Sequence, residues 1–224
     1  MKPISECRLY TFVDTGYLRG RSPAAVAEEL CEGGADLIQL RAKQVSLDEV
    51  RRLAEAVRLV TLRADVGLVV NDHPAIAQAV GADFCHLGQE DFFGAHRSHV
   101  SELGAALVSN GSGEHGRPAV RVGLSTHSPE QANRAVAAGA HYLGVGPVYP
   151  TGTKPGAAPV TLSYVRWAAE HVRTPWFAIG GITLENLDAV LGAGGRRVCV
   201  VSAILQAPDI VDACRQFKRR LGEP

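Results

Sequence analysis

The sequence predicts an α/β fold, a single (β/α)8 TIM-barrel domain over residues 1–224. Eight short apolar runs alternate with segments of helical periodicity, as expected for buried parallel strands separated by covering helices. The length of 224 residues and the apolar content of 46% suit one core of barrel size. An open, doubly wound sheet is the alternative architecture. The expected strands are Arg8–Val13, Leu37–Leu40, Gly67–Val70, Phe84–Leu87, Val120–Leu124, Tyr142–Val145, Trp176–Ile179 and Val198–Val201.

Helix boundaries support the same alternation. Helix starts are expected at Ser22-Pro23, Ser46, Ser128-Pro129 and Pro208, where a hydroxyl cap or a first-turn proline suits the helix amino terminus. Glycines end helices before alternate strands, at Gly33-Gly34, Gly81, Gly139 and Gly192–Gly195. Their spacing of about 50 residues fits two strand–helix units per repeat and four repeats in the barrel.

One region departs from this regularity. Residues Ala105–Ala119 are rich in glycine and polar side chains, which predicts a flexible surface loop before the fifth strand. The loop enters a strand, so it is expected on the barrel face opposite the functional one.

Composition narrows the function classes. Lys+Arg and Asp+Glu balance at 23 each, which argues against nucleic acid or an anionic membrane as the main partner. The five cysteines form no CxxC pair, no stretch is apolar over a membrane-spanning length, and no signal-peptide core opens the chain. These features predict a cytoplasmic protein with reduced cysteines. They leave open whether the chain forms a homo-oligomer.

Polar residues follow the second expected strand. Gln39, Arg41 and Lys43 are two apart, so in an extended segment they share one face. If that face is inward, they place an amide and two cations at the barrel mouth, where the cations could bind phosphate oxygens. The alternative is an exposed charge pair at the start of a loop.

Two carboxylates follow the third and fourth strands. Asp72 and Asp91 are expected to lie close together, because neighbouring strands are about 4.8 Å apart. Mg²⁺ uses one or two protein carboxylates and completes its shell with water and phosphate oxygens, so the pair predicts one Mg²⁺ per site. Alternatively, Asp72 caps the helix that begins near Pro74. Glu90 is adjacent to Asp91, so in an extended segment it points to the opposite face and is expected to lie outside the site.

The later strand ends add hydroxyls and glycines. Ser125 could donate to a phosphate or to a ring nitrogen, whereas His127 is expected to be structural, near the cap at Ser128. The stretch 144–156, GVGPVYPTGTKPG, resembles an anion-binding loop that could close over a ligand. Gly180-Gly181 and Ser202 follow strands seven and eight, where barrels often bind a phosphate. Together the strand ends predict a site for small phosphorylated molecules.

The ordered motifs QLRAK, ND, HLGQED, GLSTH, GPVYPTGTKPG, AIGGI and VVSAI resemble those of the thiamine-phosphate synthase family over nearly the whole chain. The resemblance implies a Mg²⁺-dependent transferase that joins a hydroxymethylpyrimidine diphosphate to a thiazole phosphate, giving thiamine monophosphate and pyrophosphate. It assigns the diphosphate to Arg41, Lys43, Ser125 and Lys154, and the pyrimidine to Gln39 and Asn71. It assigns Mg²⁺ to Asp72 and Asp91. It assigns the thiazole phosphate to Thr151, Thr153, Gly181, Val201 and Ser202.

Two alternatives have a different chemistry. A thiazole tautomerase of the same fold would use the phosphate side and a histidine such as His127, without the joint set of cations and carboxylates. A barrel that only senses phosphate would gain little from paired carboxylates. The resemblance also leaves a departure unexplained, because residues 92–120 are longer and more irregular than the usual family segment.

Overall fold

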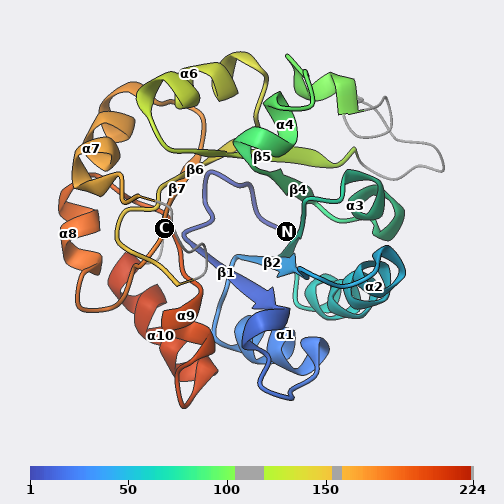
Figure 1. Cartoon of the computed structure of the whole chain (residues 1–224). Coiled ribbons are helices and arrows are strands. Elements are labelled where there is room, and N and C mark those ends of the chain that lie inside the picture. The colour runs from blue at the N-terminus through green and yellow to red at the C-terminus, as the bar shows by residue number, and fades with distance from the viewer. Residues whose placement is uncertain (104–118, 153–157, 223–224) are drawn as a thin grey trace.

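Eight parallel strands close into a barrel in the computed structural model, which describes residues 1–103, 119–152 and 158–222. Each strand pairs with the next, and β8 pairs back with β1 through Leu9–Val198 and Tyr10–Cys199, so the open-sheet alternative is excluded. Figure 1 looks down the barrel. The strands are β1 Leu9–Asp14, β2 Leu37–Arg41, β3 Gly67–Asn71, β4 Phe84–Leu87, β5 Arg121–Thr126, β6 Tyr142–Val145, β7 Trp176–Ile179 and β8 Val198–Cys199.

Helices form a ring outside the strands (Figure 1). They are α1 Pro23–Glu32, α2 Leu47–Arg63, α3 Pro74–Val80, α4 Gln89–Phe93, α6 Pro129–Ala137, α7 Thr161–His171, α8 Leu187–Gly192, α9 Ser202–Leu205 and α10 Ile210–Leu221. Two short 3-10 turns, η1 Thr15–Tyr17 and η2 Val100–Leu103, complete the described elements. None of the helices in the described ranges is both long and apolar enough to cross a bilayer.

The predicted helix boundaries are largely confirmed. The hydroxyls of Ser22, Ser46 and Ser128 accept hydrogen bonds from the first turns of α1, α2 and α6. Gly34, Gly81, Gly139 and Gly194 have the positive φ angles of a left-handed helix stop. The last helix differs from the prediction. It begins at Ile210 rather than at Pro208, because the Asp209 carboxylate caps it through the N–H of Asp212.

The core lies inside the barrel and between the strands and the helices. Strands such as β1 and β6 are buried along their whole length, which explains their continuous apolar sequences. Tyr142 fills the barrel interior opposite Gly123. A Cβ atom at Gly123 would lie 2.1 Å from the Tyr142 ring, so only glycine leaves room for that side chain.

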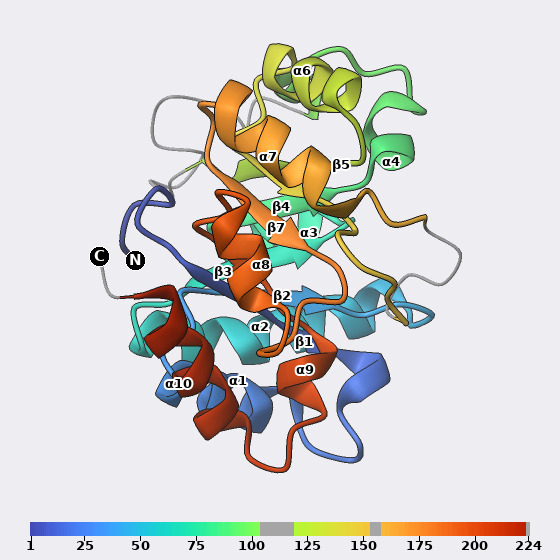
Figure 2. The same ribbon diagram turned by 90° about the vertical axis from the view of Figure 1, so that its left-hand side faces the viewer.

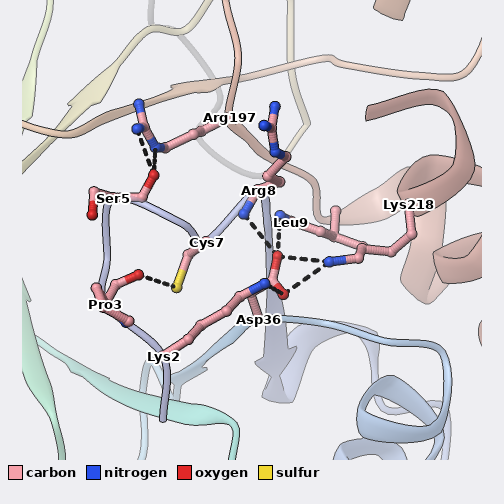
Figure 3. A network of polar contacts seen from close by, with 9 residues as sticks. All are labelled: Lys2, Pro3, Ser5, Cys7, Arg8, Leu9, Asp36, Arg197 and Lys218. Atoms are coloured by element: carbon pink, nitrogen blue, oxygen red, sulfur yellow. Dashed lines mark hydrogen bonds and ion pairs between the residues drawn. The ribbon is translucent and has the colours of Figure 1, made fainter. Parts of the chain in front are cut away.

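An ion-pair network ties together the barrel end at which the strands begin (Figure 3). Asp36, just before β2, accepts hydrogen bonds from the backbone N–H groups of Arg8 and Leu9. Its carboxylate also pairs with Lys2 at 2.7 Å and with Lys218 of α10 at 2.8 Å. The N-terminal segment, β1, β2 and the last helix therefore meet at one buried carboxylate. The amino terminus lies at this end of the barrel (Figure 2).

All strands run in the same direction, so their carboxyl ends meet at the other end of the barrel. The polar strand-end residues singled out above are thereby brought to one rim. The irregular segment predicted at 105–119 lies almost entirely outside the described residues.

Candidate active site

A pocket of about 380 Å³ opens among the carboxyl ends of the strands. Eleven of the predicted site residues line it: Gln39, Arg41, Lys43, Asn71, Asp72, Asp91, Ser125, Thr151, Gly181, Val201 and Ser202. Thr153 and Lys154 lie outside the described residues. One rim of the barrel therefore gathers residues that are up to 163 positions apart in the chain, from Gln39 to Ser202.

The cationic side of the pocket comes from β2 and the residues after it. Gln39, Arg41 and Lys43 all line the pocket, which is the inward one of the two placements considered for them, although β2 ends at Arg41 and Lys43 follows the strand. Arg41 is held by Asp14 at the end of β1, with Nη1 2.8 Å from Oδ2. Lys43 forms an ion pair with Asp72 across the pocket mouth. Both cations thus have carboxylate partners that also fix their directions.

The turn after β3 directs Asp72 into the pocket. Its φ of 63° is left-handed, a conformation that Asp adopts more readily than most non-glycine residues, and its N–H donates to the carbonyl of His86. The cap of α3 is His73, which makes no side-chain cap hydrogen bond, so the alternative role of Asp72 as a helix cap is wrong. Its carboxylate pairs instead with Lys43.

Asp91 reaches the same pocket by a different route. Residues Gln89–Phe93 form α4, so the strand-like alternation assumed for Glu90 and Asp91 was wrong and a helical turn sets their directions. Gln89 donates to the carbonyl of Ser125, which fastens α4 to β5. The Asp91 carboxylate folds back over Gly88, where a Cβ atom would lie 2.7 Å from Oδ2. Glu90 is exposed and does not line the pocket, as predicted.

The carboxylates that line the pocket suit a hard cation that completes its coordination with water and phosphate oxygens. Within the described ranges, no three His, Cys, Asp or Glu side chains are arranged to hold a metal ion. Asp72 and Asp91 are the carboxylates of the set predicted for Mg²⁺, and both line the pocket. A pair of carboxylates with room for water and phosphate oxygens fits Mg²⁺ and does not fit a structural zinc site.

The pocket floor is aromatic. Tyr10, Phe12, Tyr142 and Phe177 line it from β1, β6 and β7. The ring of Tyr10 packs edge-on against Phe177 at 5.3 Å between centroids, and Phe177 packs against Tyr142 at 5.8 Å. A floor of this kind suits a flat heteroaromatic ring of a ligand. The charged side chains of the pocket, such as Arg41, Lys43 and Asp72, come from the strand ends.

A chain of hydrogen bonds crosses this floor. Gln39 Nε2 donates to Tyr10 Oη, which lies 3.1 Å from Tyr142 Oη. Tyr142 Oη lies 3.0 Å from His86 Nδ1, and His86 Nε2 lies 2.9 Å from Ser125 Oγ. Burial raises the pKa of both Tyr10 and Tyr142 well above 10, so both phenols stay protonated near pH 7.

His127 and Ser128 share the turn after β5. Ser128 is the cap of α6, and the N–H of His127 donates to Gln131 Oε1 in the same helix. The His127 ring bonds to the carbonyl of Gly146, which joins this turn to the end of β6. These hydrogen bonds fit the structural role predicted for His127, and the residue also lines the pocket.

Glycines bring the later loops together. A Cβ atom at Gly181, which has a φ of 63°, would lie 2.5 Å from the carbonyl oxygen of Pro150, so the loop after β7 contacts the loop after β6. Helix α8 begins at Leu187. Before it, Asn186 accepts a hydrogen bond from the Thr183 N–H and donates one to the Gly181 carbonyl. The helix that begins at the pocket on this side is α9, whose first residue, Ser202, lines the pocket together with Gly181.

A model of the family described as thiamine monophosphate synthase matches residues 9–204. The chain belongs to this family. Among relatives of the thiamine monophosphate synthase family, thiamine-phosphate synthase from Thermus thermophilus is 44% identical over 195 residues, or 87% of this chain and 86% of that protein. The enzyme of the same name from Acidothermus cellulolyticus is 42% identical over 222 residues, covering 98% and 97%. Thiamine phosphate pyrophosphorylase from Pyrococcus furiosus superimposes with a TM-score of 0.80 at 30% identity, covering 97% and 96%.

Sequence reasoning missed four side chains that shape this thiamine monophosphate synthase pocket. None of the four, His86, Tyr10, Tyr142 and Asp14, was given a part in the predicted site. Tyr10 lines the pocket two residues before Phe12 on β1, so the alternation of side chains along that strand was a signal that could have found it. No local signal pairs Asp14 with Arg41, because the two are joined only by the register of β1 against β2.

Proposed function

We propose that this chain is a thiamine-phosphate synthase that joins a hydroxymethylpyrimidine diphosphate to a thiazole phosphate, releasing pyrophosphate. The observation that carries the proposal is one pocket with an aromatic floor and a rim of paired cations and carboxylates. Flat rings suit the floor, and phosphates with a hard cation suit the rim. Family membership gives the same activity.

The diphosphate belongs on the side of Arg41 and Lys43, with Lys154 and Ser125 as further donors. Arg41 can offer a planar fork to phosphate oxygens, and Asp14 already holds it in direction. Lys43 can exchange Asp72 for a phosphate oxygen, since its partly exposed ammonium group lies at the pocket mouth. Gln39 and Asn71 also line the pocket, and their amide groups suit the polar edge of the pyrimidine.

Asp72 and Asp91 are the residues that would hold Mg²⁺. When bound, the ion would neutralise negative charge that develops on the departing diphosphate. The ion pair of Asp72 with Lys43 supports these assignments, because it places the proposed metal ligand next to a proposed diphosphate ligand. Both groups could then stabilise charge on the same leaving group.

The thiazole phosphate belongs on the side of Gly181 and Ser202, with Thr151, Thr153 and Val201. Backbone N–H groups around two glycines and a serine hydroxyl at the start of α9 can donate to a phosphate. In this proposal the two phosphorylated substrates share one aromatic floor, with the diphosphate at the end of β2 and the thiazole phosphate at the ends of β7 and β8.

The reaction then breaks the bond between the pyrimidine methylene carbon and the diphosphate oxygen. The bonding pair leaves with the diphosphate, and the thiazole nitrogen lone pair forms the new bond to the same carbon. No enzyme nucleophile is required. Cys199 lines the pocket, but burial raises the pKa of its thiol well above 9, so it stays protonated. The chain contributes positioning, charge stabilisation and exclusion of water.

One assay tests this function against a thiazole tautomerase. Purified protein is incubated with both phosphorylated substrates, with and without Mg²⁺, and thiamine monophosphate and pyrophosphate are quantified. The synthase predicts equal amounts of both products, formed only with the metal. Arg41→Ala should abolish the condensation while thiazole phosphate still binds. Proton movement on thiazole phosphate alone, without condensation, would favour the tautomerase.

A further inference from the structure

A second cavity, of about 360 Å³, lies at the barrel end where the strands begin, opposite the site described above. Four residues line it. Three are arginines, namely Arg8 before β1 and Arg196 and Arg197 before β8, and the fourth is Ser5 of the N-terminal segment. Because β1 and β8 are neighbours, barrel closure is what brings Arg8 to Arg197. The proposed function uses none of these residues.

The positive charges of this cavity are not balanced by carboxylates. Throughout the described parts of the chain, none of the three guanidinium groups forms an ion pair with Asp or Glu. Asp36 is nearby, but its carboxylate accepts a hydrogen bond from the backbone N–H of Arg8 and forms its ion pairs with Lys2 and Lys218. Figure 3 shows the guanidinium groups of Arg8 and Arg197 extending away from Asp36.

Arg197 is also held in place. Arg197 donates from Nε and Nη2 to the carbonyl of Ser5 at 3.2 and 2.7 Å, which fixes its guanidinium plane against the N-terminal segment. Burial lowers the pKa of Arg197, and the nearby charge of Arg8 lowers it further. Two guanidinium groups that repel one another at a shared cavity gain free energy when an anion lies between them.

We propose that this cavity is a second anion site, which binds the phosphate or diphosphate group of a small molecule. The planar guanidinium fork matches phosphate oxygens, and three arginines line this one cavity. A volume of about 360 Å³ exceeds the needs of a single phosphate and accommodates a diphosphate or a phosphorylated metabolite. The balanced net charge and the small extent of the arginine cluster argue against nucleic acid as the ligand.

Calorimetric titration with inorganic pyrophosphate, at low ionic strength and without Mg²⁺, tests the proposal. The test variant is the double change Arg8→Gln and Arg196→Gln. It keeps Arg197 and its hydrogen bonds to Ser5, so the fold of the N-terminal segment is preserved. Lys43→Gln weakens pyrophosphate binding at the other rim and separates the two sites. Arg166→Gln is the matched control, since Arg166 is exposed on α7 and lines neither cavity.

We expect a binding phase that persists in Lys43→Gln and that weakens by at least roughly tenfold in the double variant, with Arg166→Gln unchanged. Thiamine phosphate formation by the double variant should remain at the wild-type level, because neither arginine lies in the active-site pocket. Titration curves that are the same with and without Arg8 and Arg196 would overturn the second site. That result would leave the proposed function intact, because the enzyme assay tests it separately.

Discussion

His86 Nε2 lies 2.9 Å from Ser125 Oγ, so a histidine of β4 and a serine of β5 are joined across the floor of the pocket. The amide nitrogen of Gln39 donates to Tyr10, and each hydroxyl after it can then donate to the next acceptor. In that direction His86 accepts at Nδ1 and donates from Nε2. The hydrogen of the Ser125 hydroxyl is left to point at a ligand, which makes His86 a positioning residue.

His86→Ala should therefore lower kcat/KM for the pyrimidine diphosphate by about 10- to 100-fold, because Ser125 loses the donor that orients it. The affinity for thiazole phosphate should change little. Steady-state kinetics with each substrate varied in turn measures the difference. His171→Ala is the control, since His171 is exposed at the end of α7. Equal losses for both substrates would point to general damage of the fold rather than to the positioning of Ser125.

Asp14→Asn should raise the KM for the pyrimidine diphosphate by about tenfold, because Arg41 loses the partner that fixes its direction. Asn can still accept from the N–H of Gly16, so the local turn is retained. The side chain of Asp14 is only 2% exposed and that of Arg41 24%, so loss of the pair should also cost about 2 to 3 kcal/mol of unfolding free energy.

Urea unfolding and steady-state kinetics measure the two effects of Asp14→Asn. Asp48→Asn, an exposed carboxylate at the start of α2, is the control and should change neither by much. An unaltered KM in Asp14→Asn would mean that Arg41 keeps its place without Asp14.

Asp91→Asn should abolish turnover or shift its Mg²⁺ dependence to much higher concentrations, because one of the two carboxylates is lost. Activity is measured against Mg²⁺ concentration. The adjacent Glu90→Gln is a matched control that also removes one carboxylate of α4, from a residue outside the pocket lining. The metal assignment fails if both variants give the same Mg²⁺ curve as the wild type.

Asp36→Asn should destabilise the barrel by about 2 kcal/mol near pH 7, because the ammonium groups of Lys2 and Lys218 lose their shared partner. Burial alone would raise the pKa of Asp36. The two lysines and the N–H groups of Leu9 and Arg8 outweigh it and hold that pKa below 3.8.

A lowered folded-state pKa stabilises the protein above the unfolded pKa of about 3.9, and this contribution is lost as the pH falls through the folded value. The difference in unfolding free energy between wild type and Asp36→Asn should therefore shrink below about pH 4. Urea unfolding at a series of pH values measures it. Asp65→Asn, whose carboxylate is 80% exposed and pairs with the chain's amino terminus, should show a much smaller effect at every pH. A constant difference from pH 7 to pH 3 for Asp36→Asn would contradict the linkage.

The sequence by itself determined the barrel and most of the rim. Continuous apolar runs, serine caps and glycine stops are local signals, and they identified every strand to within two residues at each end. The spacing of Gln39 and Arg41 was enough to place them on one face of β2, because side chains alternate along a strand whatever surrounds it.

Only the tertiary structure decided which groups of distant segments touch. The pairing of Arg41 with Asp14, the bond of His86 to Ser125 and the meeting of Arg8 with Arg197 all depend on strand register and on closure of β8 onto β1. The same holds for Asp91, whose direction follows from a helical turn that the strand pattern did not indicate. Local periodicity constrains the face on which a residue lies, whereas its partner is set by packing between segments far apart in the chain.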